Sequence, residues 1–121
     1  MRPQRSYRDY LRDILQATEE ALEFVQGMDH SNFSSDRKTN LAVVRSLEII
    51  GEAARHVPLA VRRRHPLVPW QDMVGMRNKL IHQYYGVDSQ VLWRTLQEDL
   101  PPLRDVIRGI LGEMESEDQS S

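Results

Sequence analysis

The chain of 121 residues contains no cysteine. Neither a disulfide framework nor a thiolate metal site is therefore possible. No apolar run approaches the ~20 residues that a membrane span needs. The polar stretch Met1–Arg5 leads into an amphipathic segment, so we expect no signal peptide and no membrane partner. These absences favour a cytoplasmic protein, and the length suits one domain with one hydrophobic core.

The sequence also lacks the motifs of several common catalytic sites. It has no glycine-rich phosphate loop and no serine-nucleophile motif. His56 and His65 are too isolated to indicate a metal site, because no His-x-x-x-His or Glu-x-x-His arrangement is present. We therefore predict no bound metal and no cofactor.

The charged residues are unevenly distributed, although the formal net charge is only −2. The segment Glu113–Asp118 contains four acids and no base, which leaves the rest of the chain slightly basic. The basic residues concentrate at Arg55, Arg62, Arg63, Arg64, Arg77 and Lys79. A local basic surface of this kind can bind a nucleic-acid backbone. Taken alone, Arg62–Arg64 are better explained as a solvated surface loop.

The spacing of the apolar residues predicts an all-α protein. A first helix is expected to start near Ser6 and Asp9 and to end near Gly27. Its apolar residues recur at helical spacing from Leu11 to Val25. A polar connector, His30–Ser35, is expected to follow this helix.

A second helix is expected over Asp36–Val57. The core face of this helix is predicted to comprise Leu41, Val44, Leu47, Ile50 and Ala54. Residues 58–69 contain three prolines and basic residues, which predicts a turn-rich linker or one short helical piece.

The C-terminal half predicts two further helices. One begins at Pro69, with Asp72 near its positive end, and stops at Gly86. The other spans Asp88–Met114 and is kinked or split at Pro101–Pro102, since proline lacks the backbone donor. The inward-facing residues of this last helix are predicted to be Leu92, Leu96, Leu103, Ile107, Ile110 and Leu111.

Four such helices predict an up-and-down four-helix bundle over residues 1–114, followed by a disordered acidic tail over residues 115–121. Trp70 and Trp93 are predicted to be core anchors rather than platforms for stacked bases. Because a bundle this small leaves apolar surface exposed, we expect a homodimer.

Two carboxylates on the second helix form a candidate site. Glu48 and Glu52 lie one turn apart, and paired carboxylates can bind a divalent metal or transfer protons. We favour the alternative that they form a solvated face or pair with Arg45 and Arg55.

The segment from Arg77 to Tyr84, here called the Arg77–Tyr84 motif, is the strongest candidate for chemistry. Arg77 supplies a permanent cation, and His82 supplies a group that transfers protons near neutral pH. Asn78 lies one helical turn before His82, where its amide can orient the imidazole. The alternative from spacing alone is that Arg77 is a surface cation and His82 a packed or capping residue near a helix end.

The pattern Arg-x4-His-x-Tyr at Arg77, His82 and Tyr84 resembles the signature of the HEPN superfamily, and specifically of the HepT-like toxins. Similar flanking segments are Ser46–Ala54, Pro69–Met76, Tyr85–Asp88 and Asp99–Leu103, so that the resemblance covers roughly residues 36 to 111. One departure is Ile81, which stands where a small residue is common.

The resemblance implies a four-helix bundle, a homodimer with both motifs in a shared cleft, and a metal-independent endoribonuclease toxin of the type VII kind. It implies that Arg77 and His82 are catalytic, with Asn78 in support. It also implies a partner, an MntA-type nucleotidyltransferase antitoxin that adenylylates Tyr84.

Two classes of function follow from these residues. The first is a ribonuclease toxin acting on RNA, favoured by the intact Arg77 and His82 pair. The second is a non-catalytic HEPN module that binds nucleotide or RNA, or docks a nucleotidyltransferase.

Overall fold

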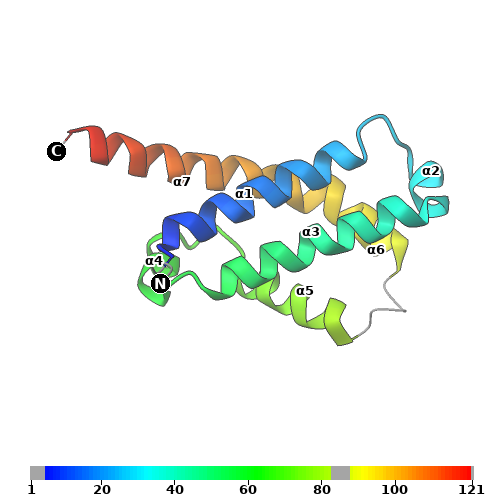
Figure 1. Ribbon diagram of the computed structural model, residues 1–121, viewed down its shortest axis with the longest axis horizontal. Helices are drawn as coiled ribbons and strands as arrows, with labels where there is room; N and C mark the ends of the chain where they lie inside the picture. Colours follow the sequence, from blue (N-terminus) through cyan, green and yellow to red (C-terminus); the bar gives the residue numbers. More distant parts are fainter. Residues whose placement is uncertain (1–4, 83–87, 121) are drawn as a thin grey trace.

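The computed structural model describes residues 5–82 and 88–120, and for residues 77–82 and residue 120 it describes the backbone alone. The described residues form helices and no strand, which confirms the predicted all-α class (Figure 1). The helices are α1 (Tyr7–Phe24), α2 (His30–Ser35), α3 (Arg37–Arg55), α4 (Leu59–Arg64), α5 (Trp70–His82), α6 (Ser89–Arg94), the π-helix η1 (Thr95–Asp99) and α7 (Leu100–Ser120).

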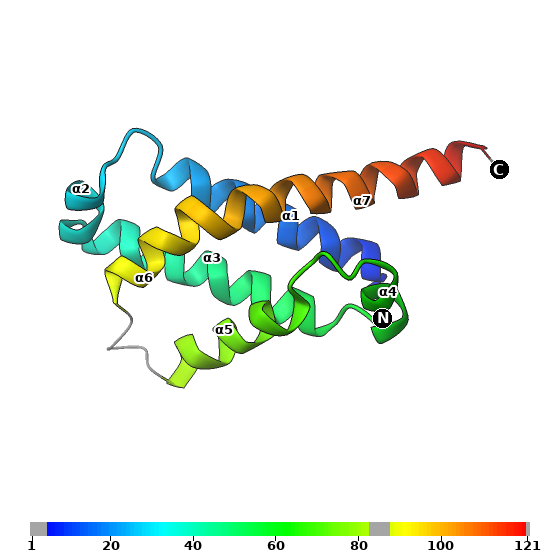
Figure 2. The same ribbon diagram turned by 180° about the vertical axis from the view of Figure 1, so that it is seen from behind.

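The helix α3 lies at the centre of the bundle. It packs against α1 on one side and α5 on the other, while α1 also packs against α7 (Figures 1 and 2). The core consists of apolar residues from all of these helices, including the fully buried Leu11, Ile14 and Ile107. Among the described residues, no helix combines the length and apolar character needed to cross a bilayer.

The start of α1 agrees with the sequence prediction. The backbone N–H of Ser6 donates to the carboxylate of Asp9 at 3.2 Å, which is half of a capping box that satisfies free amides at the helix start. After the helix, Gly27 has a φ of 81°, a left-handed conformation that glycine adopts without a steric penalty.

The segment predicted as a polar connector is instead the short helix α2. Asp29 caps it by accepting a hydrogen bond from the backbone N–H of Asn32 at 2.7 Å. The prediction was wrong because α2 has one apolar residue, Phe33, which is too few to show a helical period. That ring is fully buried and lies 5.4 Å from the ring of Trp93, so tertiary packing stabilises the turn.

Four of the five residues predicted for the core face of α3 are buried, and Leu41 is not. Its side chain is 41% exposed. Leu41 lies one turn before Arg45 and two turns before Glu48, so it belongs to the solvated stripe of the helix. The predicted start of α3 is confirmed, since Asp36 accepts a hydrogen bond from the backbone N–H of Thr39 at 3.1 Å.

The predicted fourth helix is split at its proline pair, as expected. The break has a specific form, because the turn before Pro101 is the π-helix η1. Two successive prolines remove two backbone donors, and the ring of Pro101 cannot approach the carbonyl four residues earlier in a regular α-helix. A wider π turn relieves this conflict. The six predicted inward-facing residues of this segment are all buried.

The acidic tail differs from the prediction of disorder. The structure continues α7 as a helix to Ser120, and its last turns extend past the rest of the bundle (Figure 2). Arg8 on α1 pairs with Asp118 through both terminal guanidinium nitrogens. This ion pair connects the two ends of the chain, which composition alone does not reveal.

The two phenylalanines allow a test of this core. Phe33→Ala removes a fully buried ring, whereas Phe24→Ala removes one that is 43% exposed. We expect Phe33→Ala to lower the free energy of unfolding by about 3–5 kcal/mol in a urea titration. Phe24→Ala should cost markedly less, and equal losses would contradict the packing described for α2.

Candidate active site

The helix α5 contains most of the Arg77–Tyr84 motif. It begins at Trp70, one residue after the predicted start at Pro69, and its backbone is helical through Arg77, Asn78 and His82. In a helix, Asn78 and His82 lie one turn apart on the same side, and Arg77 lies about 7.5 Å before His82 along the axis. The side chains of these three residues, and all of Tyr84, lie outside the described residues.

The first half of α5 fixes the direction of the helix. Trp70 is buried, and its indole N–H donates to the carbonyl of His65 at 3.0 Å. Met73, one turn later, is also buried, and the helix packs along α3. Trp70 is therefore a core anchor, as predicted. Trp93 is half-buried, stacks on the ring of His30 and packs at a tilt against the ring of Phe33. The motif thus follows two turns of well-packed helix.

The paired carboxylates of α3 are held in ion pairs. Glu48 lies 3.6 Å from the guanidinium of Arg45, and Glu52 lies 3.0 Å from that of Arg55. Glu52 also lies 3.1 Å from Nε2 of His56. This confirms the predicted pairing with Arg45 and Arg55, while both carboxylates are half-buried rather than fully solvated. In the part of the chain that the structure describes, no cluster of three or more His, Asp and Glu side chains is placed to hold a metal ion.

The basic cluster divides into structural and exposed arginines. Arg62 extends back over the end of α3 and donates to the carbonyls of Ala54, Arg55 and Val57 at 2.9, 3.1 and 3.0 Å. It caps carbonyls that a helix end leaves without partners. Arg63 and Arg64 are exposed at the end of α4, so the predicted surface loop is a helix with one inward arginine.

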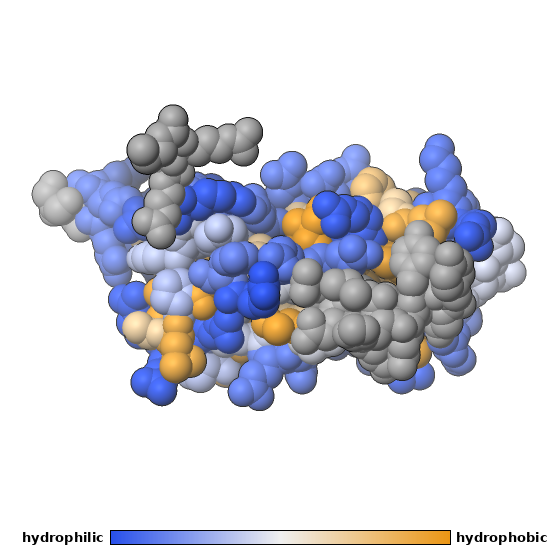
Figure 3. All heavy atoms as spheres, turned by 60° about the horizontal axis from the view of Figure 1, so that its bottom comes forward, coloured by the Kyte–Doolittle hydropathy of each residue, from blue (hydrophilic) through white to orange (hydrophobic). Residues whose placement is uncertain are grey.

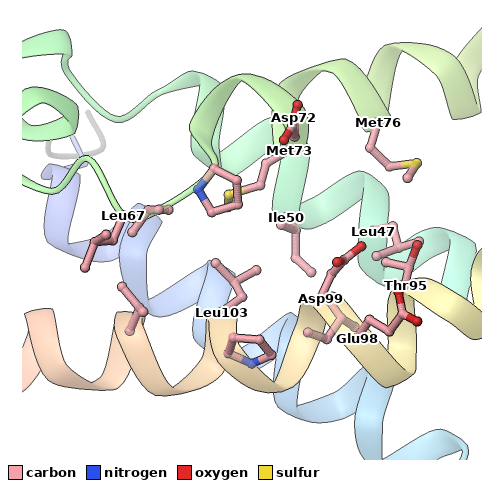
Figure 4. Close-up of a pocket in the computed structure, with 15 residues that line it drawn as sticks. Leu47, Ile50, Leu67, Asp72, Met73, Met76, Thr95, Glu98, Asp99 and Leu103 are labelled. Carbon is pink, nitrogen blue, oxygen red and sulfur yellow. The ribbon is translucent and has the colours of Figure 1, made fainter.

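A cavity of about 330 Å³, here called the α5–α7 cavity, lies beside the motif helix. Its walls come from α3, α5, η1 and α7 (Figure 4). Most of the lining is apolar and includes Leu47, Ile50, Met73, Met76, Leu103 and Val106. Figure 3 shows hydrophobic residues interrupting the hydrophilic surface on the face that includes α5. The volume is at the lower end of the range for ligand pockets.

Three carboxylates form the polar part of this cavity, here called its acidic edge. Asp72 comes from α5, and Glu98 and Asp99 come from η1 on the opposite wall (Figure 4). Partial burial raises the pKa of the Asp99 carboxyl, and the charges of Glu98 and Asp72 raise it further. This group is not predictable from the sequence, because Asp72 lies far from Glu98 and Asp99 in the chain. The pair Pro101–Pro102 predicts a break in the last helix but does not predict the carboxylates beside that break.

An all-helical bundle with an Arg-x4-His segment on a packed helix defines a HEPN-like protein. The family model described as "Ribonuclease HepT-like" matches residues 14–110. The chain belongs to the ribonuclease HepT-like family.

Curated relatives agree with this assignment. A probable ribonuclease HepT of Thermococcus cleftensis is 50% identical over 100 residues, which cover 83% of this chain and 91% of the relative. A putative RNase of Caldanaerobacter subterraneus is 43% identical, over 86% of this chain and 93% of the relative. A putative RNase of Methanocaldococcus jannaschii is 35% identical over 98% of both chains. No solved structure is significantly similar to this chain.

The structural role of Arg62 can be tested by unfolding. Arg62→Ala removes the side chain that donates to three carbonyls at and just beyond the end of α3, and we expect a loss of about 1.5–3 kcal/mol. Arg45→Ala removes an arginine whose side chain is 71% exposed, so its effect should stay within about 0.5 kcal/mol. Urea titrations of both variants provide the measurement. A small loss for Arg62→Ala would show that the cap is unimportant.

Proposed function

We propose that this protein is a metal-independent endoribonuclease, and that it acts as the toxin of a type VII-like toxin–antitoxin pair. The observation that supports this most is the intact Arg77 and His82 pair on α5 of a chain in the ribonuclease HepT-like family. The names of its relatives, which describe them as ribonucleases, point the same way.

The proposed reaction uses the nucleophile that RNA itself contains. The 2′-hydroxyl oxygen attacks the adjacent phosphorus while a neutral His82 imidazole accepts the hydroxyl proton. The bond from phosphorus to the 5′-oxygen breaks, and this oxygen accepts a proton from an imidazolium. The products are a 2′,3′-cyclic phosphate and a 5′-hydroxyl.

This reaction needs an acid and a base, while the motif contains a single histidine. A homodimer supplies two copies of His82, one to accept a proton and one to donate it. The two copies of Arg77 stabilise the negative charge on the phosphate through paired N–H donors. The proposed active site therefore forms between two protomers.

The second part of the proposal concerns regulation at Tyr84. In the nucleotidyltransferase partner, the hydroxyl oxygen of Tyr84, two residues beyond His82, attacks the α-phosphorus of ATP. AMP becomes joined to Tyr84, and pyrophosphate leaves. The added group brings bulk and negative charge next to Arg77, where it competes with the RNA backbone. Toxicity falls while the bundle stays folded.

The catalytic assignment predicts a large effect at His82. His82→Ala removes the proton carrier and should slow cleavage of total RNA by about 10²–10⁴-fold. Arg77→Lys should also be poor, because an ammonium lacks the fork of parallel donors. Cleavage by the parent should persist in the presence of a chelator.

Two matched variants control for these changes. His30→Ala and Arg108→Lys make the same replacements at α2 and α7, and both should cut RNA at the parent rate. If His82→Ala cuts as fast as the parent, the catalytic assignment is wrong. A parent that does not cut RNA would instead favour the non-catalytic binding module.

Modification of Tyr84 is tested by co-expression with a cognate nucleotidyltransferase. Mass spectrometry should find one or more added AMP groups on the peptide that contains Tyr84, and Tyr84→Phe should abolish the addition. The neighbouring change Tyr85→Phe should leave it intact. An unmodified peptide from a neutralised complex would mean that the partner inhibits by occlusion.

A further inference from the structure

The α5–α7 cavity lies next to an unusually exposed leucine. Leu67 is 86% exposed and lines one end of the cavity (Figure 4). Single exposed leucines are common on protein surfaces and need no explanation. This one differs because it lies beside an apolar cavity, in a short segment that contains Pro66 and Pro69. A projecting apolar side chain and an apolar recess are thus adjacent on one surface.

The charges around this surface are also complementary. The acidic edge of the cavity comprises Asp72, Glu98 and Asp99, and both charged groups that act on Asp99 are carboxylates. Their mutual repulsion would be relieved by a nearby cation. The exposed Arg63 and Arg64 precede Leu67 by only a few residues. The recess thus has an acidic edge, and the projecting Leu67 follows two exposed arginines in the chain.

A surface that contains both a recess and a side chain able to fill such a recess can pair with a second copy of itself in a two-fold dimer. In such a dimer the same patch meets itself, so that each element on one copy faces its complement on the other. We propose that the α5–α7 cavity binds Leu67 of a second copy of this chain, with Arg63 and Arg64 of that copy against the acidic edge.

This inference rests on the proposed function, which requires two copies of the motif. The inference identifies the surface through which the two copies contact each other. The helix α5 forms one wall of the cavity, and Arg77 directly follows the wall residue Met76. A contact through this cavity brings α5 of both protomers into one interface. The dimer also buries apolar wall that a single copy leaves open to water.

Two leucines provide a matched test of the apolar contact. Leu67→Asp should raise the dissociation constant of the dimer on the order of a hundredfold, because two leucines lose their burial at once. Leu59→Asp makes the same change on α4 at a residue that is 58% exposed and does not line the cavity, so it should leave dimerisation unchanged. Sedimentation equilibrium at micromolar concentration measures both, with circular dichroism to confirm the fold.

Charge reversal tests the polar contact, because two misfolded variants would not regain dimerisation when they are mixed. The pair Arg63→Glu and Arg64→Glu places acid against acid, and the pair Glu98→Lys and Asp99→Lys places base against base. Each doubly changed chain alone should dimerise at least about tenfold more weakly than the parent. An equimolar mixture should restore both the dimer and RNA cleavage, since both contacts of the mixed dimer then join opposite charges.

The outcomes separate this inference from the proposed function. A dimeric, RNA-cleaving parent whose dimer survives Leu67→Asp unchanged would overturn this interface and leave the proposed function standing. So would a mixture of the two charge-reversed chains that stays as weak as each chain alone. A parent that is monomeric and cleaves RNA would overturn both the interface and the two-protomer active site.

Discussion

The packing of α5 along α3 is the contact on which the rest of the site depends. Trp70 and Met73 are buried in the first turns of α5, so the direction of the helix is set before the motif begins. The helix α3 in turn packs against α1, and its ends are closed by Asp36 and by Arg62. A motif placed two turns beyond a buried tryptophan is held by the core rather than by a loop. Catalytic groups on packed helices are positioned more accurately than groups on loops.

Local chemistry made much of this fold predictable. The caps at Ser6 and Asp36 and the break at Pro101 each follow from the hydrogen-bonding ability of one or two residues. Long-range packing was less predictable. The helix α2 depends on Phe33 contacting Trp93, sixty residues away, and the end of α7 is held by an ion pair between Arg8 and Asp118.

The candidate site is likewise predictable where it depends on local sequence and unpredictable where it depends on long-range packing. The Arg77–Tyr84 motif could be found from the sequence because its residues are contiguous and helical spacing relates their positions. The acidic edge of the α5–α7 cavity could not, because Asp72 meets Glu98 and Asp99 only after α5 and η1 pack on opposite sides of a shared space. The basic run Arg62–Arg64 also does not show from sequence that the side chain of Arg62 turns inward to the end of α3.

The central claim is that RNA supplies its own nucleophile to an acid and base from two histidines. It is tested most directly by comparing one RNA oligonucleotide with the same sequence methylated at every 2′-oxygen. The account predicts that the plain RNA is cut to products with a 2′,3′-cyclic phosphate, and that the methylated RNA remains intact while still binding. Cleavage of both at similar rates would contradict it, because the attacking oxygen would then come from water.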